Sequence, residues 1–582
     1  MILQSLYDYY QRKTDLPREG FEWKEIPFVI EVNTSGSVVQ IEDTRKQEGN
    51  KKRAKPYYIP QGVKKSGNVV ANLLWGNAEY VLGLPDSKKL SEAKSKAKET
   101  EYRKNLKDKR EAFIRKIKSL PPPCQADEGV RAVVRFCEHN DYTALERFTE
   151  WKEVQTSNQN ITFRLQGDIE LICQRQAVTD AVSKSATTAT PDGVCLITGD
   201  TDEIERLHAP IKGVMGAQTA GANIISFNHP AFKSWGKKQG SNAPVGKRSA
   251  FSYTTALNYL LGKDSRQHLQ VGDASTVFWA DKPSPLEDQF ADIFEDDPVD
   301  DPDRGALAIR ALYEAPHQGI APINDDQTRF FVLGLAPNAA RIAIRFWHVG
   351  TVAELAKSIQ QHFDDLEIVR SRREKPHLSV LRLLRAVAVQ GQSKNIPPNL
   401  SGEVMRSIMG RLPYPDTLMQ GAIRRVRAER EVTYPRAAII KACLNRRASI
   451  AQTSEKEITV SLDHSNMNPG YRLGRLFAVL EKIQEEAGPD IKATILERFY
   501  GAASSTPVTV LSNLMKLKNH HLAKLENRGR RVNLERLICE IMDGVDDFPS
   551  HLNLADQGRF NIGYYHQRHA LFTKSTETKQ GD

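Results

Sequence analysis

The chain has 582 residues, 40% of them hydrophobic, and a formal net charge of +10 at pH 7, a length that predicts about three to five structural units. No run of about 18 apolar residues occurs, which excludes a membrane-spanning helix, and the N-terminus lacks the basic and apolar regions of a signal peptide. None of the six cysteines forms a CxxC pair, so neither a zinc ribbon nor a disulfide framework is expected. We therefore expect a cytoplasmic protein whose basic surplus favours a polyanionic partner, although a merely soluble basic protein has the same composition.

The N-terminal part predicts mixed α and β structure. Residues 2–13 have helical spacing, and residues 22–42 predict a β-hairpin that turns between Asn33 and Gly36. Segment 45–65 follows, in which lysines and arginines are mixed with tyrosines and glycines. This composition predicts a loop that touches a sugar-phosphate backbone.

Two strongly charged stretches come next. Residues 86–118 hold 13 Lys and Arg against 6 Asp and Glu and predict an exposed helix, either a solvated face or a nucleic-acid contact. The prolines at 121–123 predict its end and a domain boundary. Residues 287–303 hold nine acids and no Lys or Arg, which predicts an acidic connector or exposed loop.

A second hairpin and a helical region follow. Residues 328–335 and 341–347 alternate as strands do, and Thr351 is the predicted N-cap of a helix that reaches about Phe363. From about residue 386 onward the pattern is helical. Five helices are predicted near 470–487, 490–500, 507–527, 531–544 and 557–572.

The expected fold class is α+β, a mixed α/β N-terminal region with β-hairpins followed by a C-terminal all-helical bundle. Gly488 and Gly501 are the predicted ends of two of these helices, and Pro507 follows a predicted N-cap. The expected domains are 1–120, 121–385, 386–466 and 467–582.

Residues 212–223 have glycines at the spacing of a phosphate-binding P-loop. Asn223 and the residue before it stand where that loop needs Lys and Ser or Thr, and residues 224–227 predict a strand instead of a helix. We therefore exclude ATP hydrolysis by this motif and interpret the segment as a loop whose backbone comes close to DNA. The side chains of Lys212, Gln218 and Asn223 suit contacts with base edges or phosphates.

Further basic side chains follow the Gly-rich segment. Lys237, Lys238 and Lys247 are predicted DNA contacts. Two aromatic residues just before them, Phe232 and Trp235, are expected to fill a core.

Two basic clusters lie in the helical part. Arg424 and Arg425 fall on one predicted helix, whereas Lys516, Lys524 and Arg528 recur at multiples of four and are expected to share a helix face. A groove for a single strand has such clusters, and so do ordinary surface helices.

Signals of catalysis are missing from the sequence. Neither HExxH nor GxSxG occurs. His566 and His569 lie three residues apart on a predicted helix, but no acid or cysteine beside them completes a metal site, so we interpret them as packing or surface residues. We expect no catalytic residue, no bound metal and no cofactor.

Several stretches, taken together and in order, carry a resemblance over about the first 350 residues. They are LQSLYDYY from Leu3, GFEWKEIPF from Gly20, NLLWGN from Asn72, CLITGD from Cys195, IKGVMGAQ from Ile211 and FVLGLAPNAAR from Phe331. In this combination the chain resembles the large subunit of the type I-C CRISPR Cascade surveillance complex.

The resemblance implies a non-catalytic subunit that assembles with crRNA-containing backbone subunits. Such a subunit recognises a short PAM in double-stranded target DNA, helps to open the duplex, holds the displaced single strand and helps to recruit a helicase-nuclease. The residues expected to contact DNA or the PAM are Lys52, Arg53, Asn72, Asn77, Lys212, Gln218, Asn223, Lys237, Lys238 and Lys247. Those expected to hold the displaced strand or its backbone are Arg424, Arg425, Lys516, Lys524 and Arg528.

The resemblance also implies a small subunit made from the C-terminal part through an internal start. Met467 precedes the five predicted helices and is the candidate start, with Met405, Met409 and Met419 in competition. Two alternatives to the function implied by the resemblance remain: a metal-dependent nuclease that acts on bound DNA, and a purely structural scaffold subunit.

Overall fold

The chain divides into two units. The computed structural model describes residues 1–48, 51–63, 69–92, 96–139, 142–187, 192–296, 301, 303–314, 327–453, 457–488, 491, 493–543 and 545–573. The first unit, unit 1, comprises Met1–Arg12, His208–Ser226 and Ala256–Asp582. The second, unit 2, comprises Lys13–Leu207 and Phe227–Thr255, so that the division falls within helix α9 (Lys247–Leu260).

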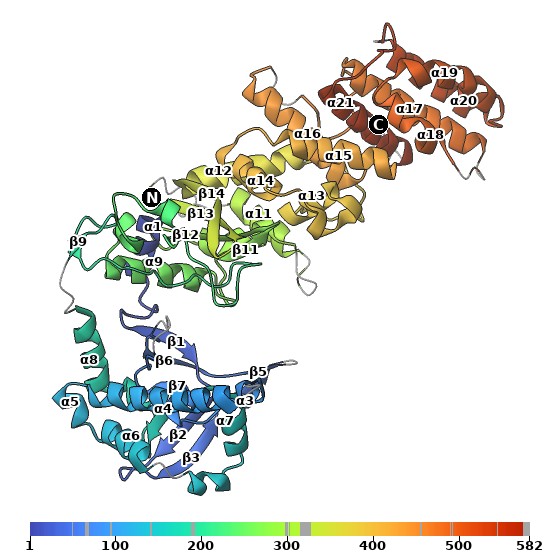
Figure 1. The fold of residues 1–582 in the computed structure, drawn as a ribbon. Coiled ribbons are helices and arrows are strands. Elements are labelled where there is room, and N and C mark those ends of the chain that lie inside the picture. The colour runs from blue at the N-terminus through green and yellow to red at the C-terminus, as the bar shows by residue number, and fades with distance from the viewer. Residues whose placement is uncertain are drawn as a thin grey trace, which may run out of the picture. The chain divides into compact units, whose positions relative to one another are not determined.

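A mixed four-stranded sheet forms the centre of unit 2 (Figure 1). Its order is β3-β2-β8-β7, in which β2 and β8 run parallel and the other neighbours antiparallel. The strands are β2 (Phe28–Val32), β3 (Val38–Asp43), β7 (Trp75–Asn77) and β8 (Asn160–Leu165). The β2–β3 pair confirms the predicted hairpin, and its turn is closed by the Gly36 N–H, which donates to the Asn33 carbonyl at 2.9 Å.

Short antiparallel pairs extend unit 2 beside the sheet. They are β1 (Phe21–Glu25) with β6 (Pro56–Pro60), β4 (Lys46–Glu48) with β5 (Lys51–Arg53), and β9 (Gly193–Val194) with β10 (Thr201–Asp202). The prediction of a loop over 45–65 was therefore wrong for its first part, because alternate residues of β6, Tyr57 and Ile59, are buried as strand residues. Lys64 and Lys65 lie outside the described residues.

Helices make up much of the rest of unit 2, and α2 and α6 contact strands of its central sheet. They are α2 (Ala78–Val81), α3 (Ser87–Glu92), α4 (Lys96–Lys118), α5 (Pro122–Gln125), α6 (Glu128–His139), α7 (Trp151–Ser157) and α8 (Gln176–Thr187). The aromatic rings of Phe113 on α4 and Phe136 on α6 pack on that of Phe163 on β8, with centroids 6.5 and 5.4 Å away. The basic helix predicted at 86–118 thus has one face in the core. The same core contains residues before and after prolines 121–123.

An antiparallel sheet in the order β11-β12-β13-β14 is the corresponding centre of unit 1. Its strands are β11 (His268–Val271), β12 (Ala274–Ala280), β13 (Arg329–Asn338) and β14 (Arg341–Thr351). The second predicted hairpin is confirmed by β13 and β14. Thr351 is also confirmed as an N-cap, since its hydroxyl accepts the Glu354 N–H at 3.1 Å and the Glu354 carboxylate accepts the Thr351 N–H at 2.9 Å.

The acidic stretch at 287–303 begins as a buried helix, α10 (Leu286–Phe294). Phe290 and Phe294 belong to the core, and the carboxylate of Glu287 accepts hydrogen bonds from Arg12 on helix α1 (Ile2–Arg12) at 2.6 Å. The prediction of a connector or exposed loop was therefore wrong for 287–294, because a partner far away in the sequence neutralises the buried charge. Residues 297–300 and 302 lie outside the described part.

Helices make up most of the rest of unit 1, and those from about residue 386 onward confirm the predicted helical region. They are α11 (Arg304–Glu314), α12 (Val352–Leu366), α13 (Val380–Val387), α14 (Leu400–Gly410), α15 (Asp416–Glu429), α16 (Tyr434–Ile450), α17 (Pro469–Ala487), α18 (Ile495–Ala503), α19 (Val508–Ala523), α20 (Arg528–Met542) and α21 (Leu554–Phe572). Gly488 ends α17 as expected, whereas α18 runs past Gly501 to Ala503. The fold class is α+β, and among the described residues no helix combines the length and apolarity needed to cross a membrane.

Buried histidines stabilise the helical part by packing. His566 on α21 is 1% exposed and its Nδ1 lies 2.9 Å from the hydroxyl of Tyr471 on α17. Burial lowers the pKa of His566 to about 3, so the ring is neutral at pH 7. The interpretation of His566 as a packing residue is confirmed, and the described residues contain no group of three or more His, Cys, Asp and Glu side chains that could hold a metal.

Candidate nucleic-acid interface

A basic hairpin in unit 2 carries Lys52 and Arg53. At its base, Arg45 donates two hydrogen bonds to the carboxylate of Asp43 at 2.7 and 2.6 Å, and this pairing lowers the pKa of Asp43. Lys52 and Arg53 are exposed, and Arg53 forms an exposed ion pair with Glu25 at 3.0 Å. Such a pair contributes less than about 1 kcal/mol, so both cations can be transferred to a phosphate at little cost.

In unit 2, Asn72 is buried and Asn77 is half-buried. Asn72 is 8% exposed, and its Oδ1 accepts the Val63 N–H at 2.9 Å, which holds the chain that follows β6. Asn77 precedes α2 without capping it, and its buried Oδ1 has no hydrogen-bond partner within the described part of the chain. As placed, Asn72 supports a loop, and a base edge could reach it only after that loop moves.

The Gly-rich segment of unit 1 is a closed loop. Ile211 and Ala222 exchange backbone hydrogen bonds of 2.8 and 2.9 Å across its neck. At Gly221, whose φ is +91°, a Cβ atom would lie 2.7 Å from the Ile211 carbonyl oxygen, so glycine is needed for the neck to close. The predicted strand at 224–227 is absent, because the extended backbone stops at the single bridge that Asn223 forms with Arg341.

The polar side chains of this loop have different surroundings. Gln218 is exposed at the second turn of the loop, where its carbonyl accepts the Gly221 N–H at 2.8 Å. Lys212 is also exposed, beside Asn258. The amide of Asn223 instead donates to the His208 carbonyl at 2.9 Å, so its donor group is used within the unit. Of these three polar side chains, Gln218 and Lys212 are thus the two that face solvent.

A second exposed loop, residues 228–246, belongs to unit 2. Lys237 and Lys238 are exposed on it, whereas Lys247 follows it and forms an ion pair with Glu203. Phe232 and Trp235 are 40% and 96% exposed, so the expectation that they fill a core was wrong. Their hydrophobicity suggested burial, whereas the flanking lysines and glycines were the signal of a surface loop.

The C-terminal basic clusters lie on or directly beside three helices of unit 1. Arg424 on α15 is exposed, but Arg425 beside it is mostly covered and lies 3.8 Å from Glu429. Lys516 is exposed on α19, which ends at Ala523, four residues earlier than predicted. Lys524 therefore follows that helix and Arg528 begins α20, both exposed, so the spacing of four does not continue along one helix face.

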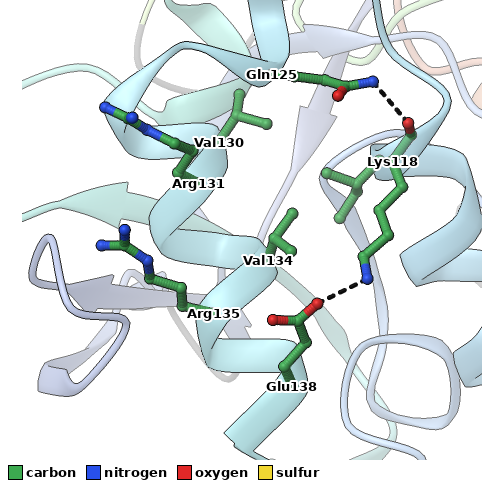
Figure 2. Close-up of a pocket in the computed structure, with 8 residues that line it drawn as sticks. Lys118, Gln125, Val130, Arg131, Val134, Arg135 and Glu138 are labelled. Carbon is green, nitrogen blue, oxygen red and sulfur yellow. Dashed lines mark hydrogen bonds and ion pairs between the residues drawn. The ribbon is translucent and has the colours of Figure 1, made fainter.

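A groove of about 510 Å³ between the end of α4 and α6 was not foreseen from the sequence. Figure 2 shows Val130 and Val134 facing Lys118, whose Nζ lies 2.6 Å from the carboxylate of Glu138. The amide of Gln125 donates to the Lys118 carbonyl at 2.9 Å and closes one end. Val130 and Val134 belong to an ordinary amphipathic pattern on α6. In the sequence, valines that line a groove therefore look the same as valines that pack in a core.

Comparison with known proteins identifies the family. The model of the family described as CRISPR-associated protein (Cas_Csd1) matches residues 6–572, a range that includes unit 2, most of unit 1 and all the C-terminal helices. The chain belongs to this family of CRISPR-associated proteins. No curated protein matches it. Membership of this family places the exposed cations described above in a protein of CRISPR systems.

Proposed function

We propose that this chain is the large, non-catalytic subunit of a type I-C CRISPR Cascade complex. In this role it recognises the PAM in double-stranded target DNA, helps to unwind the duplex, holds the displaced strand and helps to recruit a helicase-nuclease. The family match over residues 6–572 carries the proposal. The exposed cations and amides on loops and hairpins support it, since positioning contacts go to phosphates and specific contacts go to base edges.

The proposal is tested with the assembled complex, with and without this chain, on duplexes that bear or lack a PAM. We expect tight PAM-dependent binding only when the chain is present. Replacing both Lys52 and Arg53 by alanine should weaken binding to both duplexes. The slope of log affinity against log salt concentration should become shallower by about one for each lost phosphate contact. Replacing Gln218 with alanine should cost about 1–3 kcal/mol on the PAM duplex alone.

A matched control is Lys357→Ala, which removes an exposed cation from α12 and should leave both affinities unchanged. If the complex bound both duplexes equally, or bound equally well without this chain, PAM recognition would belong to another subunit. Cleavage of the bound duplex in Mg²⁺ by the complex without its helicase-nuclease would contradict a non-catalytic role. Binding without salt dependence would favour the scaffold alternative.

We also propose that Met467 starts a separate small subunit. Met467 is 59% exposed and precedes Asn468, the N-cap of α17, whose Oδ1 accepts the Tyr471 N–H at 3.2 Å. A product from Met467 keeps this cap and all five C-terminal helices. Starts at Met405 or Met419 would instead begin inside α14 or α15.

Mass spectrometry of the purified complex should find a fragment that begins at residue 467. A Met467→Leu change, which removes the start codon but keeps an apolar side chain, should abolish the fragment and leave the full-length chain at its normal amount. The matched change Met419→Leu should leave the fragment in place. If the wild-type complex contains no C-terminal fragment, the internal start is not used.

A further inference from the structure

An almost fully exposed tryptophan stands at the tip of the loop 228–246 in unit 2. Trp235 is 96% exposed and has a φ of +53°, a backbone conformation that residues other than glycine rarely adopt. Gly236 follows with a φ of +69°. A large apolar ring gains nothing for folding in this position, and a strained backbone at a surface tip suggests a purpose other than stability.

The loop keeps its shape without any contribution from the indole ring. The Oδ1 of Asn242 accepts the Ser234 N–H at 2.9 Å, and its Nδ2 donates to the Gln239 carbonyl at 2.9 Å. The Lys237 N–H donates to the Ser234 carbonyl at 2.9 Å, closing a turn around Trp235. The ring is therefore presented by a preorganised backbone, which lowers the entropic cost of binding.

The base of the loop is also fixed. The Gly240 N–H donates to the Arg206 carbonyl at 3.1 Å. A Cβ at Gly240 would lie 2.1 Å from the Glu205 carbonyl oxygen, so the two backbones touch and only glycine fits between them. The guanidinium of Arg206 donates to the side chain of Gln239 at 2.8 Å.

The charged side chains of the loop itself are all basic. Lys233, Lys237 and Lys238 are exposed, and residues 228–246 include no Asp or Glu. Within the part of the chain that the structure describes, none of these three lysines lies within ion-pair distance of a carboxylate. Lysines beside an exposed ring attract the phosphates of a nucleic acid. At the core of a protein–protein interface, by contrast, an exposed aromatic ring is normally surrounded by apolar or neutral side chains.

We propose that Trp235 stacks on an unpaired base of a single-stranded nucleic acid whose phosphates contact Lys233, Lys237 and Lys238. Stacking suits every base, because each has a π face, and the lysines follow the backbone without reading sequence. This inference rests on the proposed function and deepens it by naming a residue that would hold a single strand. The strand can be the displaced DNA or an RNA, and the two are separated by the test.

The test measures binding of the purified full-length chain to fluorescent single-stranded DNA and RNA oligonucleotides and to an abasic DNA of the same length. Trp235→Ala should weaken binding to the base-bearing strand about tenfold and leave binding to the abasic strand unchanged. Trp235→Phe should restore most of the affinity. Because the ring is 96% exposed, the thermal unfolding midpoint of all variants should equal that of the wild type.

A matched control is Trp23→Ala, which removes a 55% exposed tryptophan from β1 and should leave the affinity unchanged. A larger Trp235→Ala effect on DNA assigns the displaced strand, and a larger effect on RNA assigns an RNA. Equal loss on base-bearing and abasic strands, or no loss on either, overturns stacking. Loss of a protein subunit from the complex with normal oligonucleotide binding also overturns it and assigns a protein partner.

The two proposals fail in different assays. If Trp235→Ala binds single strands normally while the complex still distinguishes PAM duplexes, the stacking inference is wrong and the proposed function stands. If the complex is PAM-blind while Trp235→Ala still weakens only base-bearing strands, the stacking residue stands and the recognition function is wrong.

Discussion

A Gly474→Ala variant is expected to unfold at a much lower denaturant concentration than the wild-type chain, with a loss of about 3 kcal/mol in the free energy of unfolding. Gly474 lies on α17 where this helix crosses α21, and a Cβ there would stand 2.0 Å from the Phe560 carbonyl oxygen. From the other side, a Cβ at Gly563 would stand 2.0 Å from the Tyr471 carbonyl oxygen. Because backbone atoms of the facing helix occupy the space, the helices must separate to admit a methyl group.

The control for this prediction lies on α18. Gly501→Ala adds the same methyl group to a helix, but apart from the glycine's chain neighbours and the backbone of its own helix, no heavy atom of the described residues lies within 4 Å of the new Cβ. This variant should stabilise the chain by about 0.5–1 kcal/mol, since alanine loses less backbone entropy than glycine in a helix. Denaturation followed by circular dichroism would compare the three chains. Equal midpoints for Gly474→Ala and wild type would mean that α17 and α21 do not pack through this glycine.

Glu287→Ala should destabilise unit 1 by about 3–5 kcal/mol, because it leaves the largely covered guanidinium of Arg12 without its partner. Glu287 is 8% exposed, and its carboxylate accepts hydrogen bonds from the guanidinium of Arg12 at 2.6 Å, the amide of Gln267 at 2.9 Å and the Ala280 N–H at 2.9 Å. All three donors lose their acceptor in the alanine variant. Helix α1 should then lose protection against hydrogen exchange before the rest of the unit does.

Asp288→Ala is the matched control, since the neighbouring carboxylate on α10 is exposed. We expect a change within about 0.5 kcal/mol for this variant. Glu287→Gln keeps the size and the acceptor oxygen and should fall between the two. The ion pair would be unimportant for folding if thermal unfolding of the Glu287 and Asp288 alanine variants gave the same midpoint.

The local pattern of the sequence was sufficient for the elements that depend on near neighbours. The hairpin of β13 and β14 follows from alternating hydrophobicity. The start of α12 follows from Thr351 and Glu354, which cap each other three residues apart. The rejection of a P-loop needed only the residue types at Asn223 and beside it.

The candidate interface was harder to predict, because exposure depends on what the rest of the chain covers. Asn72 was expected to meet DNA and is buried, whereas Trp235 was expected in a core and is exposed. Each residue type is compatible with both environments. The loops that cover Asn72 and fix the backbone beside Trp235 are set by contacts across the fold.

The sequence by itself determined the α+β class, the caps and hairpins and, through ordered motifs, the resemblance to a CRISPR-associated family. Only the tertiary structure decided that Glu287 is buried against Arg12, that helices α17 and α21 touch through Gly474, and that Trp235 faces solvent. The physical reason is the range of the forces involved. Periodicity and capping act over a few residues, whereas burial, ion pairing and close packing join residues that the sequence separates by tens to hundreds of positions.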